Sequence, residues 1–328
     1  MEAKKAKVMI FGLEEYNIPL YERYRDRLDL KIPNARLNED TAVFTFGCDA
    51  VVPSNLDSIH AAVIDELAES GVKLIALRSA GYDYVDIGYA KEKGLAVANV
   101  PDYSPWSIAE FAVALMLTVV RNTHKAYNRT REHNFSISQL AGFEFHGKTV
   151  GVIGEGKIGQ CTVSICKGMG MKVLVSTPHP HMIHGVEYVS LDELYSRADV
   201  IQLHCPLNAT TYHLINDEAI GKMKPGVVLV NTARGGLIES QALIRGLISG
   251  GIRAAGLDVY EKESAIFTKD YTNDILGDDV LQILLGFPNV LLSSHQAYFT
   301  VESLNGLCDT TVQNILEFYE TGTCRNLL

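Results

Sequence analysis

A glycine-rich segment at residues 149–160 constrains the fold of this chain more than any other part of it. The segment reads Thr-Val-Gly-Val-Ile-Gly-Glu-Gly-Lys-Ile-Gly-Gln, so a short apolar run leads directly into Gly154-x-Gly156-x-x-Gly159. The apolar run predicts a buried parallel strand, and the residues after the glycines have helical periodicity as far as Met171. Strand, tight turn and helix in this order are typical of the first unit of a dinucleotide-binding fold.

Each glycine of the pattern has a separate physical task in such a fold. The first turns the chain, the second lets a pyrophosphate approach the backbone, and the third lets the helix pack closely on the strand. The helix N-terminus offers unpaired N–H groups and the positive end of the helix dipole to the phosphates. We therefore predict a dinucleotide site with contacts at Gly154, Gly156, Lys157, Ile158 and Gly159.

Strand and helix patterns alternate on both sides of this turn. Before it, strands are predicted at residues 7–13, 41–46, 72–77 and 95–100, and helices at 59–70, 84–93 and from Pro105 onward. After it, strands are predicted at 172–177, 200–204, 226–231, 253–259 and 290–293, with helices between them and a last helix at 300–320. Such alternation predicts parallel sheets covered by helices on both faces, and 328 residues suffice for about two domains. The expected fold class is α/β, with doubly wound parallel sheets.

The end of the strand predicted at 172–177 bears on which dinucleotide binds. In NAD-binding folds an acidic residue about 20 residues after the glycines holds the ribose 2′-hydroxyl. Thr177 stands at that place instead. The missing carboxylate no longer repels a 2′-phosphate, but no Arg or Lys stands between Ser176 and Ile183 to bind one. The sequence therefore leaves both NAD(H) and NADP(H) open as the cofactor.

Three polar residues follow three of the predicted strands, namely Arg234, Glu263 and His295. Each alone has an ordinary interpretation, as a surface arginine, a solvated acid or a structural histidine. Because parallel strands end at one edge of a sheet, all three should lie at the edge that also holds the dinucleotide. A guanidinium group can bind a carboxylate in one plane, and a histidine beside a carboxylate can transfer a proton near neutral pH. The set predicts hydride transfer at a 2-oxo acid.

These motifs carry a resemblance to a known family. The glycine turn is followed in order by Asn231-Thr-Ala-Arg234-Gly, Gly256-Leu-Asp258-Val-Tyr-Glu-Lys-Glu263 and Ser294-His295-Gln-Ala. Outside them stand Ala76-Leu-Arg-Ser-Ala-Gly81, Asn99-Val-Pro-Asp-Tyr103-Ser-Pro and Val200-Ile-Gln-Leu-His204-Cys-Pro206. The chain thus resembles the D-isomer-specific 2-hydroxyacid dehydrogenase family over nearly its whole length, and within it the fermentative D-lactate dehydrogenases.

The resemblance implies two Rossmann-like, doubly wound domains with a cleft between them. The substrate domain is discontinuous, at residues 1–101 and 299–328, and the dinucleotide-binding domain is at 102–298. The resemblance also implies that Arg234 binds the substrate carboxylate, that His295 donates a proton to the carbonyl oxygen, and that Glu263 keeps this histidine charged. Substrate contacts are expected at Ser79, Ala80, Gly81, Tyr103 and Tyr298. Further cofactor contacts are expected at Thr177, His204, Cys205, Pro206, Thr232, Ala233 and Asp258.

The implied function is reversible hydride transfer between a nicotinamide cofactor and pyruvate or D-lactate. Two alternatives stay open: a dehydrogenase for another 2-oxo acid, such as a bulkier or aromatic one, and a nucleotide-sensing binding protein similar to the co-repressors of the family. One departure concerns the cofactor, since NAD-using members usually carry Asp where Thr177 stands. In such enzymes the long helix after Pro105 packs in a dimer interface, so a homodimer or a dimer-based oligomer is expected.

The composition of the chain excludes several classes of binding partner. The net charge of −10 argues against nucleic acid, and the longest mostly apolar run, 108–120, is shorter than the about 20 residues that span a bilayer. The N-terminal residues lack the apolar length of a signal peptide, and no regulatory module is evident after the last helix. The six scattered cysteines show no metal-ligand spacing. His179, His181 and His184 suggest a metal site, but Pro178 and Pro180 break any helical face that would bring them together, so no metal is expected. We expect a cytoplasmic enzyme with a small-molecule substrate.

Overall fold

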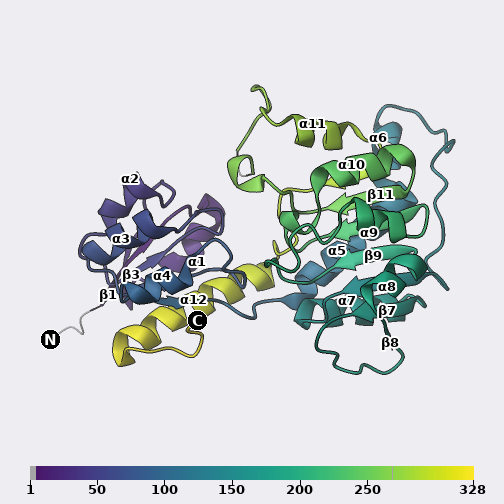
Figure 1. Ribbon diagram of the computed structural model, residues 1–328. Coiled ribbons are helices and arrows are strands. Elements are labelled where there is room, and N and C mark those ends of the chain that lie inside the picture. The colour runs from purple at the N-terminus through teal and green to yellow at the C-terminus, as the bar shows by residue number, and fades with distance from the viewer. Residues whose placement is uncertain (1–4, 268) are drawn as a thin grey trace. The chain divides into compact units, whose positions relative to one another are not determined.

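The computed structural model describes residues 5–267 and 269–328, which form two compact units (Figure 1). The first unit contains the chain up to Ser104 and is completed by Phe299–Leu328, and the second unit is Pro105–Tyr298. Each unit is built on one parallel sheet with helices on both faces. The α/β class with two doubly wound parallel-sheet units is therefore confirmed.

The first unit has a five-stranded parallel sheet in the order β2-β1-β3-β4-β5. Its strands are β1 (Ala6–Ile10), β2 (Leu28–Lys31), β3 (Ala50–Val52), β4 (Leu74–Ala76) and β5 (Ala96–Ala98). Its helices are α1 (Ile18–Glu22), α2 (Glu39–Ala42), α3 (Ala61–Glu69), α4 (Ile87–Glu92) and α12 (Val301–Thr321).

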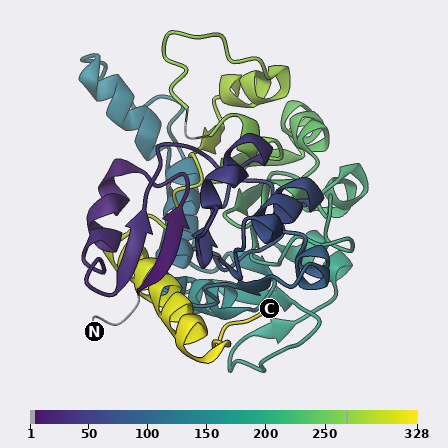
Figure 2. The same cartoon turned by 90° about the vertical axis from the view of Figure 1, so that its left-hand side faces the viewer.

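Alternate side chains of β1 supply the two cores of this unit. Val8 and Ile10 pack with α1 and α12, whereas Met9 and Phe11 pack with α2, α3 and α4. This alternation follows from the two-residue period of a strand, which sends successive side chains to opposite faces. Figure 2 shows α12, in yellow, beside the purple N-terminal strands. The last helix of the chain is therefore part of the core of the first unit.

The strand predicted at residues 41–46 is wrong. Asn38 begins α2 there, because its side-chain oxygen accepts hydrogen bonds from the backbone N–H groups of Asp40 and Thr41, and Thr41 completes a capping box. A short 3₁₀ turn, Val43–Thr45, follows the helix. The apolar alternation at 43–46 resembled a strand, yet Phe44 and Phe46 are exposed. The second and third strands are β2 and β3, which lie on either side of this segment in the sequence.

The second unit has a seven-stranded parallel sheet in the order β12-β11-β10-β9-β6-β7-β8. Its strands are β6 (Thr149–Ile153), β7 (Lys172–Ser176), β8 (Glu187–Tyr188), β9 (Val200–Leu203), β10 (Val227–Asn231), β11 (Ile252–Leu257) and β12 (Val290–Leu292). Its helices are α5 (Pro105–Arg121), α6 (Thr123–Arg131), α7 (Lys157–Gly168), α8 (Leu191–Arg197), α9 (Asp217–Lys222), α10 (Ser240–Ser249) and α11 (Asp279–Gly286).

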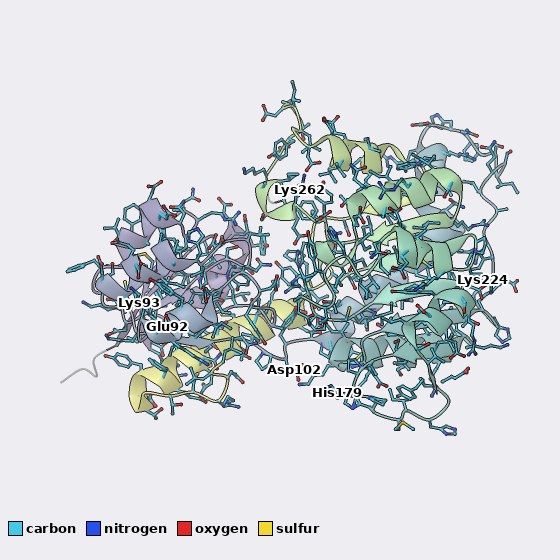
Figure 3. All side chains as sticks on the ribbon, viewed as in Figure 1. Glu92, Lys93, Asp102, His179, Lys224 and Lys262 are labelled. Atoms are coloured by element: carbon cyan, nitrogen blue, oxygen red, sulfur yellow. The ribbon has the colours of Figure 1, made fainter. Side chains whose placement is uncertain are left out.

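The chain leaves β6 toward β7 on one side, while β9 pairs with the other side of β6. The order of connections therefore reverses at β6, and such a switch point at the carboxyl edge is where parallel α/β sheets bind ligands. At the opposite edge, where the strands begin, Lys224 forms an ion pair of 2.7 Å with Asp199 (Figure 3). The glycine turn lies at the carboxyl edge.

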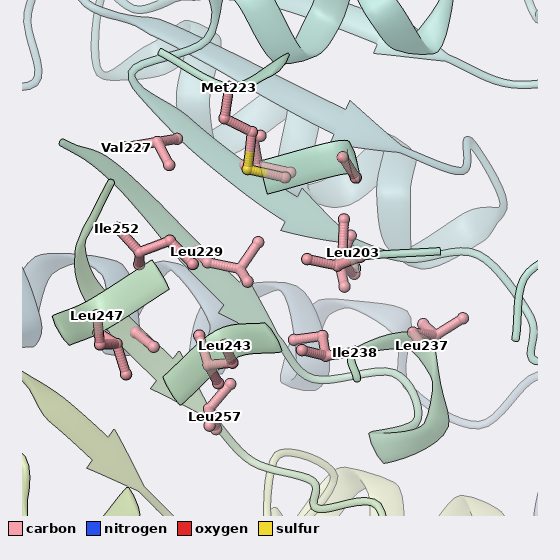
Figure 4. Close-up of a cluster of buried hydrophobic side chains, with 14 of the residues drawn as sticks. Leu203, Met223, Val227, Leu229, Leu237, Ile238, Leu243, Leu247, Ile252 and Leu257 are labelled. Carbon is pink, nitrogen blue, oxygen red and sulfur yellow. The ribbon is translucent and has the colours of Figure 1, made fainter. Parts of the chain in front are cut away.

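Two helical layers cover this sheet. Helices α5 and α7 pack on one face against Val150 and Val152 of β6. Helices α8 to α11 cover the other face, where Leu229 and Leu257 belong to a leucine-rich core (Figure 4). A Cβ atom at Gly256 of β11 would lie 3.1 Å from the Cβ of Leu115, so α5 packs closely on β11, the neighbour of the edge strand β12. The two cores hold the strand ends of the second unit in fixed register.

Candidate active site

The glycine turn after β6 has the backbone that a phosphate site requires. Gly154 has a φ of +93°, and a Cβ there would lie 2.6 Å from the backbone nitrogen of Cys205. A Cβ at Gly159 would lie 2.2 Å from the carbonyl oxygen of Gly154. Both positions therefore demand glycine. Gly156, by contrast, has open space at its Cβ position and is the N-cap of α7, where no side chain provides a cap. The first N–H groups of α7 thus have no side-chain cap, and no Cβ at Gly156 obstructs the approach of a phosphate to them.

His204, the residue directly after β9, holds the glycine turn in place by two hydrogen bonds. The backbone N–H of His204 donates to the carbonyl of Ile153 at 2.8 Å, and its ring nitrogen Nε2 lies 3.0 Å from the hydroxyl of Thr162 in α7. Burial lowers the pKa of His204 to about 4, so this ring is neutral near pH 7. Cys205 and Pro206 follow at the same edge. His204 therefore ties β9 to the strand and the helix that flank the glycines.

The turn after β10 is built by the side chain of Asn231. Its oxygen accepts a hydrogen bond from the N–H of Ala233 at 3.0 Å, and its amide donates to the carbonyl of Arg234 at 2.8 Å. The Arg234 guanidinium donates to the carbonyl of Ala233 at 2.9 Å. Among the described residues, the Thr232 hydroxyl is buried without a hydrogen-bond partner. A buried unsatisfied hydroxyl is costly, so a polar ligand atom at this strand end fits the site.

Asp258, directly after β11, is fully buried and holds the segment that carries His295. Its carboxylate accepts hydrogen bonds from the Ser293 hydroxyl at 2.6 Å and from the N–H groups of Gln296 at 2.9 Å and Ala297 at 2.8 Å. Its carbonyl accepts the N–H of His295 at 2.7 Å. Burial raises the pKa of Asp258, and these hydrogen bonds oppose the rise. The segment 293–297 is thus fixed by one aspartate, with His295 in a left-handed conformation at φ 54°.

His295 and Glu263 form a hydrogen-bonded pair. The Nδ1 atom of His295 lies 2.7 Å from Oε1 of Glu263, and Oε2 of the same carboxylate accepts the N–H of Tyr260 at 2.8 Å. Both side chains are largely shielded, with 20% and 15% of their surface exposed. The carboxylate thus fixes the orientation of the imidazole ring and leaves Nε2 as its other proton-carrying atom. The pair is a candidate acid–base group.

Arg234 and this pair belong to neighbouring strand ends, because β10, β11 and β12 are adjacent in the sheet. A Cβ at Gly235 would lie 2.1 Å from the carbonyl carbon of Tyr260. The turn that carries Arg234 is therefore packed directly on the loop that carries Glu263. Thr177, which follows β7, lies at the same edge on the other side of the switch point.

The sequence patterns missed a second histidine–carboxylate pair behind this site. Glu261 stands two residues before Glu263, and its Oε1 lies 2.7 Å from Nε2 of His213 while its Oε2 accepts the Ser240 hydroxyl at 2.8 Å. The N–H of His213 donates to the carbonyl of Gly236 at 2.8 Å. The pair therefore links the turn after Arg234 to the Glu263 loop. The sequence signals for it were the acid two residues before Glu263 and the histidine in the segment Tyr212-His213-Leu-Ile-Asn216, which also resembles the family.

The expected substrate residues Ser79, Ala80 and Gly81 follow β4 in the first unit. The Ser79 hydroxyl donates to the carbonyl of Gly81 at 2.7 Å and lies 2.8 Å from the hydroxyl of Tyr84. The side-chain amide of Asn99 donates to the carbonyl of Ala80 at 2.8 Å. Hydrogen bonds thus fix the conformation of this loop at the carboxyl end of β4.

The two expected tyrosines lie in different units. Tyr103 is in the first unit, where a Cβ at Gly306 of α12 would lie 3.0 Å from its carbonyl oxygen. Tyr298 ends the second unit and is partly buried.

Among the residues that the structure describes, no group of three or more His, Cys, Asp and Glu side chains could hold a metal ion. In that same part of the chain, no helix is long and apolar enough to cross a membrane. All six cysteines are free thiols, and five of them are buried.

A doubly wound sheet with a glycine turn at its switch point defines a dinucleotide-binding α/β protein. A family model described as the D-isomer specific 2-hydroxyacid dehydrogenase NAD-binding domain matches residues 113–297. The chain belongs to the D-isomer-specific 2-hydroxyacid dehydrogenase family, as the motifs predicted. Its second unit carries the NAD-binding domain of that family.

Three relatives illustrate the likeness. The chain is 43% identical to the D-lactate dehydrogenase of Escherichia coli strain K12, with 98% of this chain and 99% of the relative covered. It superposes with a TM-score of 0.89 on a structure described as the pyruvate reductase of Chlamydomonas reinhardtii, at 43% identity and with 96% of both chains covered. It superposes with a TM-score of 0.86 on the D-lactate dehydrogenase of Aquifex aeolicus complexed with NAD and lactic acid, at 33% identity and with 95% of both chains covered.

Proposed function

We propose that this protein is an NAD-dependent D-lactate dehydrogenase, which reduces pyruvate to D-lactate reversibly. The observation that carries the proposal is the His295–Glu263 pair at the strand end next to that of Arg234, on the sheet edge that holds the glycine turn. The names of the relatives, a D-lactate dehydrogenase and a pyruvate reductase, support this choice of substrate.

The chain offers a set of groups that fit a dinucleotide. The N–H groups at the start of α7, beside Gly156, would hold the pyrophosphate, and the Thr232 hydroxyl would receive a polar group of the ligand. When bound, the reduced nicotinamide supplies the hydride that adds to the keto carbon. The remaining steps belong to side chains of the protein.

In the proposed reaction the Arg234 guanidinium binds the pyruvate carboxylate and polarises the neighbouring carbonyl group. His295 donates a proton from Nε2 to the carbonyl oxygen, so that hydride and proton together convert the ketone into the alcohol. Glu263 holds the ring by its Nδ1–H and stabilises the positive charge that the imidazolium carries before the transfer. As the family resemblance implies, backbone N–H groups at 79–81 would bind the same carboxylate, and Tyr103 and Tyr298 would contact the substrate.

Steady-state reduction of pyruvate tests the proposal. The purified protein should oxidise NADH rapidly in the presence of pyruvate, and chiral chromatography should identify the product as D-lactate. L-lactate as the product would contradict the assignment. Faster turnover with a bulkier 2-oxo acid would instead favour the second dehydrogenase function. Binding of NADH without turnover of any 2-oxo acid would favour a nucleotide-sensing protein.

The proposal also covers the oligomeric state of the protein and its location in the cell. We propose a cytoplasmic homodimer in which α5 contributes to the interface, as the family resemblance implies. The six unpaired thiols fit a reducing compartment. Light scattering during size-exclusion chromatography should give twice the chain mass of 36.0 kDa, and a mass of one chain would contradict the dimer.

A further inference from the structure

The glycine turn contains a buried carboxylate that the proposed reaction does not use. Glu155 stands between Gly154 and Gly156 and is only 2% exposed. Its Oε1 accepts the hydroxyl of Tyr188 at 2.5 Å, and its Oε2 accepts the backbone N–H of His181 at 2.8 Å. Burying a carboxylate costs free energy unless its oxygens accept hydrogen bonds, and here both oxygens do. The side chain is thus held in one place.

That place is fixed by the register of two strands. Ile153 of β6 pairs with Ser176 of β7, and the N–H of Gly154 donates to the carbonyl of Ser176 at 2.9 Å. Glu155 and Thr177 therefore both lie just beyond the paired ends of adjacent parallel strands. From there, the Glu155 side chain reaches the loop that follows β7, because His181 lies on that loop and Tyr188 is in β8.

The end of β7 is where dinucleotide folds recognise the adenosine ribose. An acid at that strand end usually binds the 2′-hydroxyl, but Thr177 has no charge. Glu155 brings a carboxylate to the same strand end from the glycine turn. A fixed negative charge shielded from water disfavours a 2′-phosphate strongly, because charges interact more strongly where water is excluded. A 2′-hydroxyl carries no charge and is not repelled.

We propose that Glu155 is the residue that makes this site select NAD(H) over NADP(H), replacing the carboxylate that is missing at Thr177. The inference rests on the proposed function only for its cofactor class. The loop after β7 also carries histidines that could attract a phosphate when protonated, among them His179 (Figure 3). Measurements at pH 8, above the usual range of histidine titration, separate their charge from that of Glu155.

Binding titrations with NADH and NADPH, followed by nicotinamide fluorescence, test the proposal without turnover. Selectivity is the difference between two binding free energies, and repulsion of the 2′-phosphate weakens only NADPH binding. The wild-type protein should therefore bind NADH at least about 100-fold more tightly than NADPH. In Glu155→Gln, which keeps the size and the acceptor for His181, the ratio should fall at least about tenfold, mainly through tighter NADPH binding.

Tyr188→Phe is the matched control. It removes a hydrogen-bond partner of Glu155 from the same loop but leaves the negative charge, so the preference for NADH should stay close to that of the wild type. Equal loss of preference in both variants would show that loop anchoring, and not charge, sets the selectivity. That result would overturn the proposal.

The remaining outcomes are equally decisive. A wild-type protein that binds both dinucleotides equally, or neither of them, overturns the proposal whether or not Glu155→Gln folds. An unchanged ratio in a folded Glu155→Gln protein does the same. If NADH binds with a preference that depends on Glu155 while pyruvate is not reduced, the proposed function fails and the role of Glu155 stands.

Discussion

The Nδ1 atom of His295 lies 2.7 Å from Oε1 of Glu263, although 31 residues separate the two in the sequence. The other oxygen of this carboxylate is held by the N–H of Tyr260, so the acid cannot turn away from the ring. His295 is also fixed at its backbone, where its N–H donates to the carbonyl of the buried Asp258. Ring and backbone are therefore held independently, which is the arrangement that a proton donor of defined direction requires.

Replacement of His295 by Asn should leave NADH binding unchanged and lower kcat for pyruvate reduction by about 10²–10⁴-fold, the usual contribution of a general acid. Glu263→Gln should give a smaller loss, because the ring keeps a hydrogen-bond partner but loses the stabilising charge. Stopped-flow measurement of NADH oxidation checks both values. A His295→Asn protein that is folded and retains normal kcat would refute the assignment.

Arg234 should act through the geometry of its guanidinium as well as through its charge. We expect Arg234→Gln to lower kcat/KM for pyruvate by about 10²–10³-fold, since a paired charge of this kind contributes about 2–5 kcal/mol when one partner is removed. Arg234→Lys should recover only part of that loss, because an ammonium group lacks the planar fork. Full recovery by lysine would mean that charge alone binds the substrate.

Gly235→Ala should disturb both halves of the candidate site. The added Cβ would lie 2.1 Å from the carbonyl carbon of Tyr260, so the Arg234 turn and the Glu263 loop must move apart. We expect a loss of about 1–3 kcal/mol in the free energy of unfolding together with a large drop in kcat. Urea denaturation and steady-state rates measure the two effects.

Gly221→Ala is the control for this substitution. Gly221 lies in α9, where an added Cβ meets nothing within 4 Å. Alanine there should stabilise the protein by about 0.5–1 kcal/mol and leave the rate unchanged. Equal activity of the two alanine variants would show that the contact at Gly235 does not position the site.

His204 should make the stability depend on pH. Its pKa is lowered by burial to about 4 in the folded protein, whereas an unfolded histidine titrates near about 6.5. The unfolded chain therefore binds more protons between these values, and the free energy of unfolding falls as the pH decreases from about 6.5 to about 4. The full loss from this residue is about 3 kcal/mol.

Urea denaturation of the wild type and of His204→Gln, at pH 7 and pH 4.5, isolates this contribution. Buried carboxylates also titrate at low pH, but they do so in both proteins. The loss of stability on acidification should be smaller in the variant. Identical losses in both proteins would show that His204 is not the group responsible.

The hydrogen bonds that hold the loops of the candidate site in place could not be predicted from the sequence. Asp258 was expected to contact the cofactor, and in the folded chain its carboxylate holds Ser293, Gln296 and Ala297. Glu261 was not expected to have a role, and its carboxylate is hydrogen-bonded to His213 and Ser240. Both arrangements join residues that are distant along the chain. No local pattern shows that both Glu261 and Glu263 pair with histidines, or with which ones, once β10, β11 and β12 are side by side.

The sequence by itself determined the alternation of strands and helices, the parallel sheets and the glycine turn. These features depend on hydrophobic periodicity and on backbone conformations that only glycine adopts easily, and both can be read from neighbouring residues. The segment 41–46 and the side-chain direction of Glu155 were decided only by the tertiary structure. Asn38, which lies outside the apolar run, caps a helix where a strand was predicted. The register of β6 with β7 fixes where the Glu155 side chain lies. Contacts between distant segments exist only after the sheet has formed, so they lie beyond any local pattern.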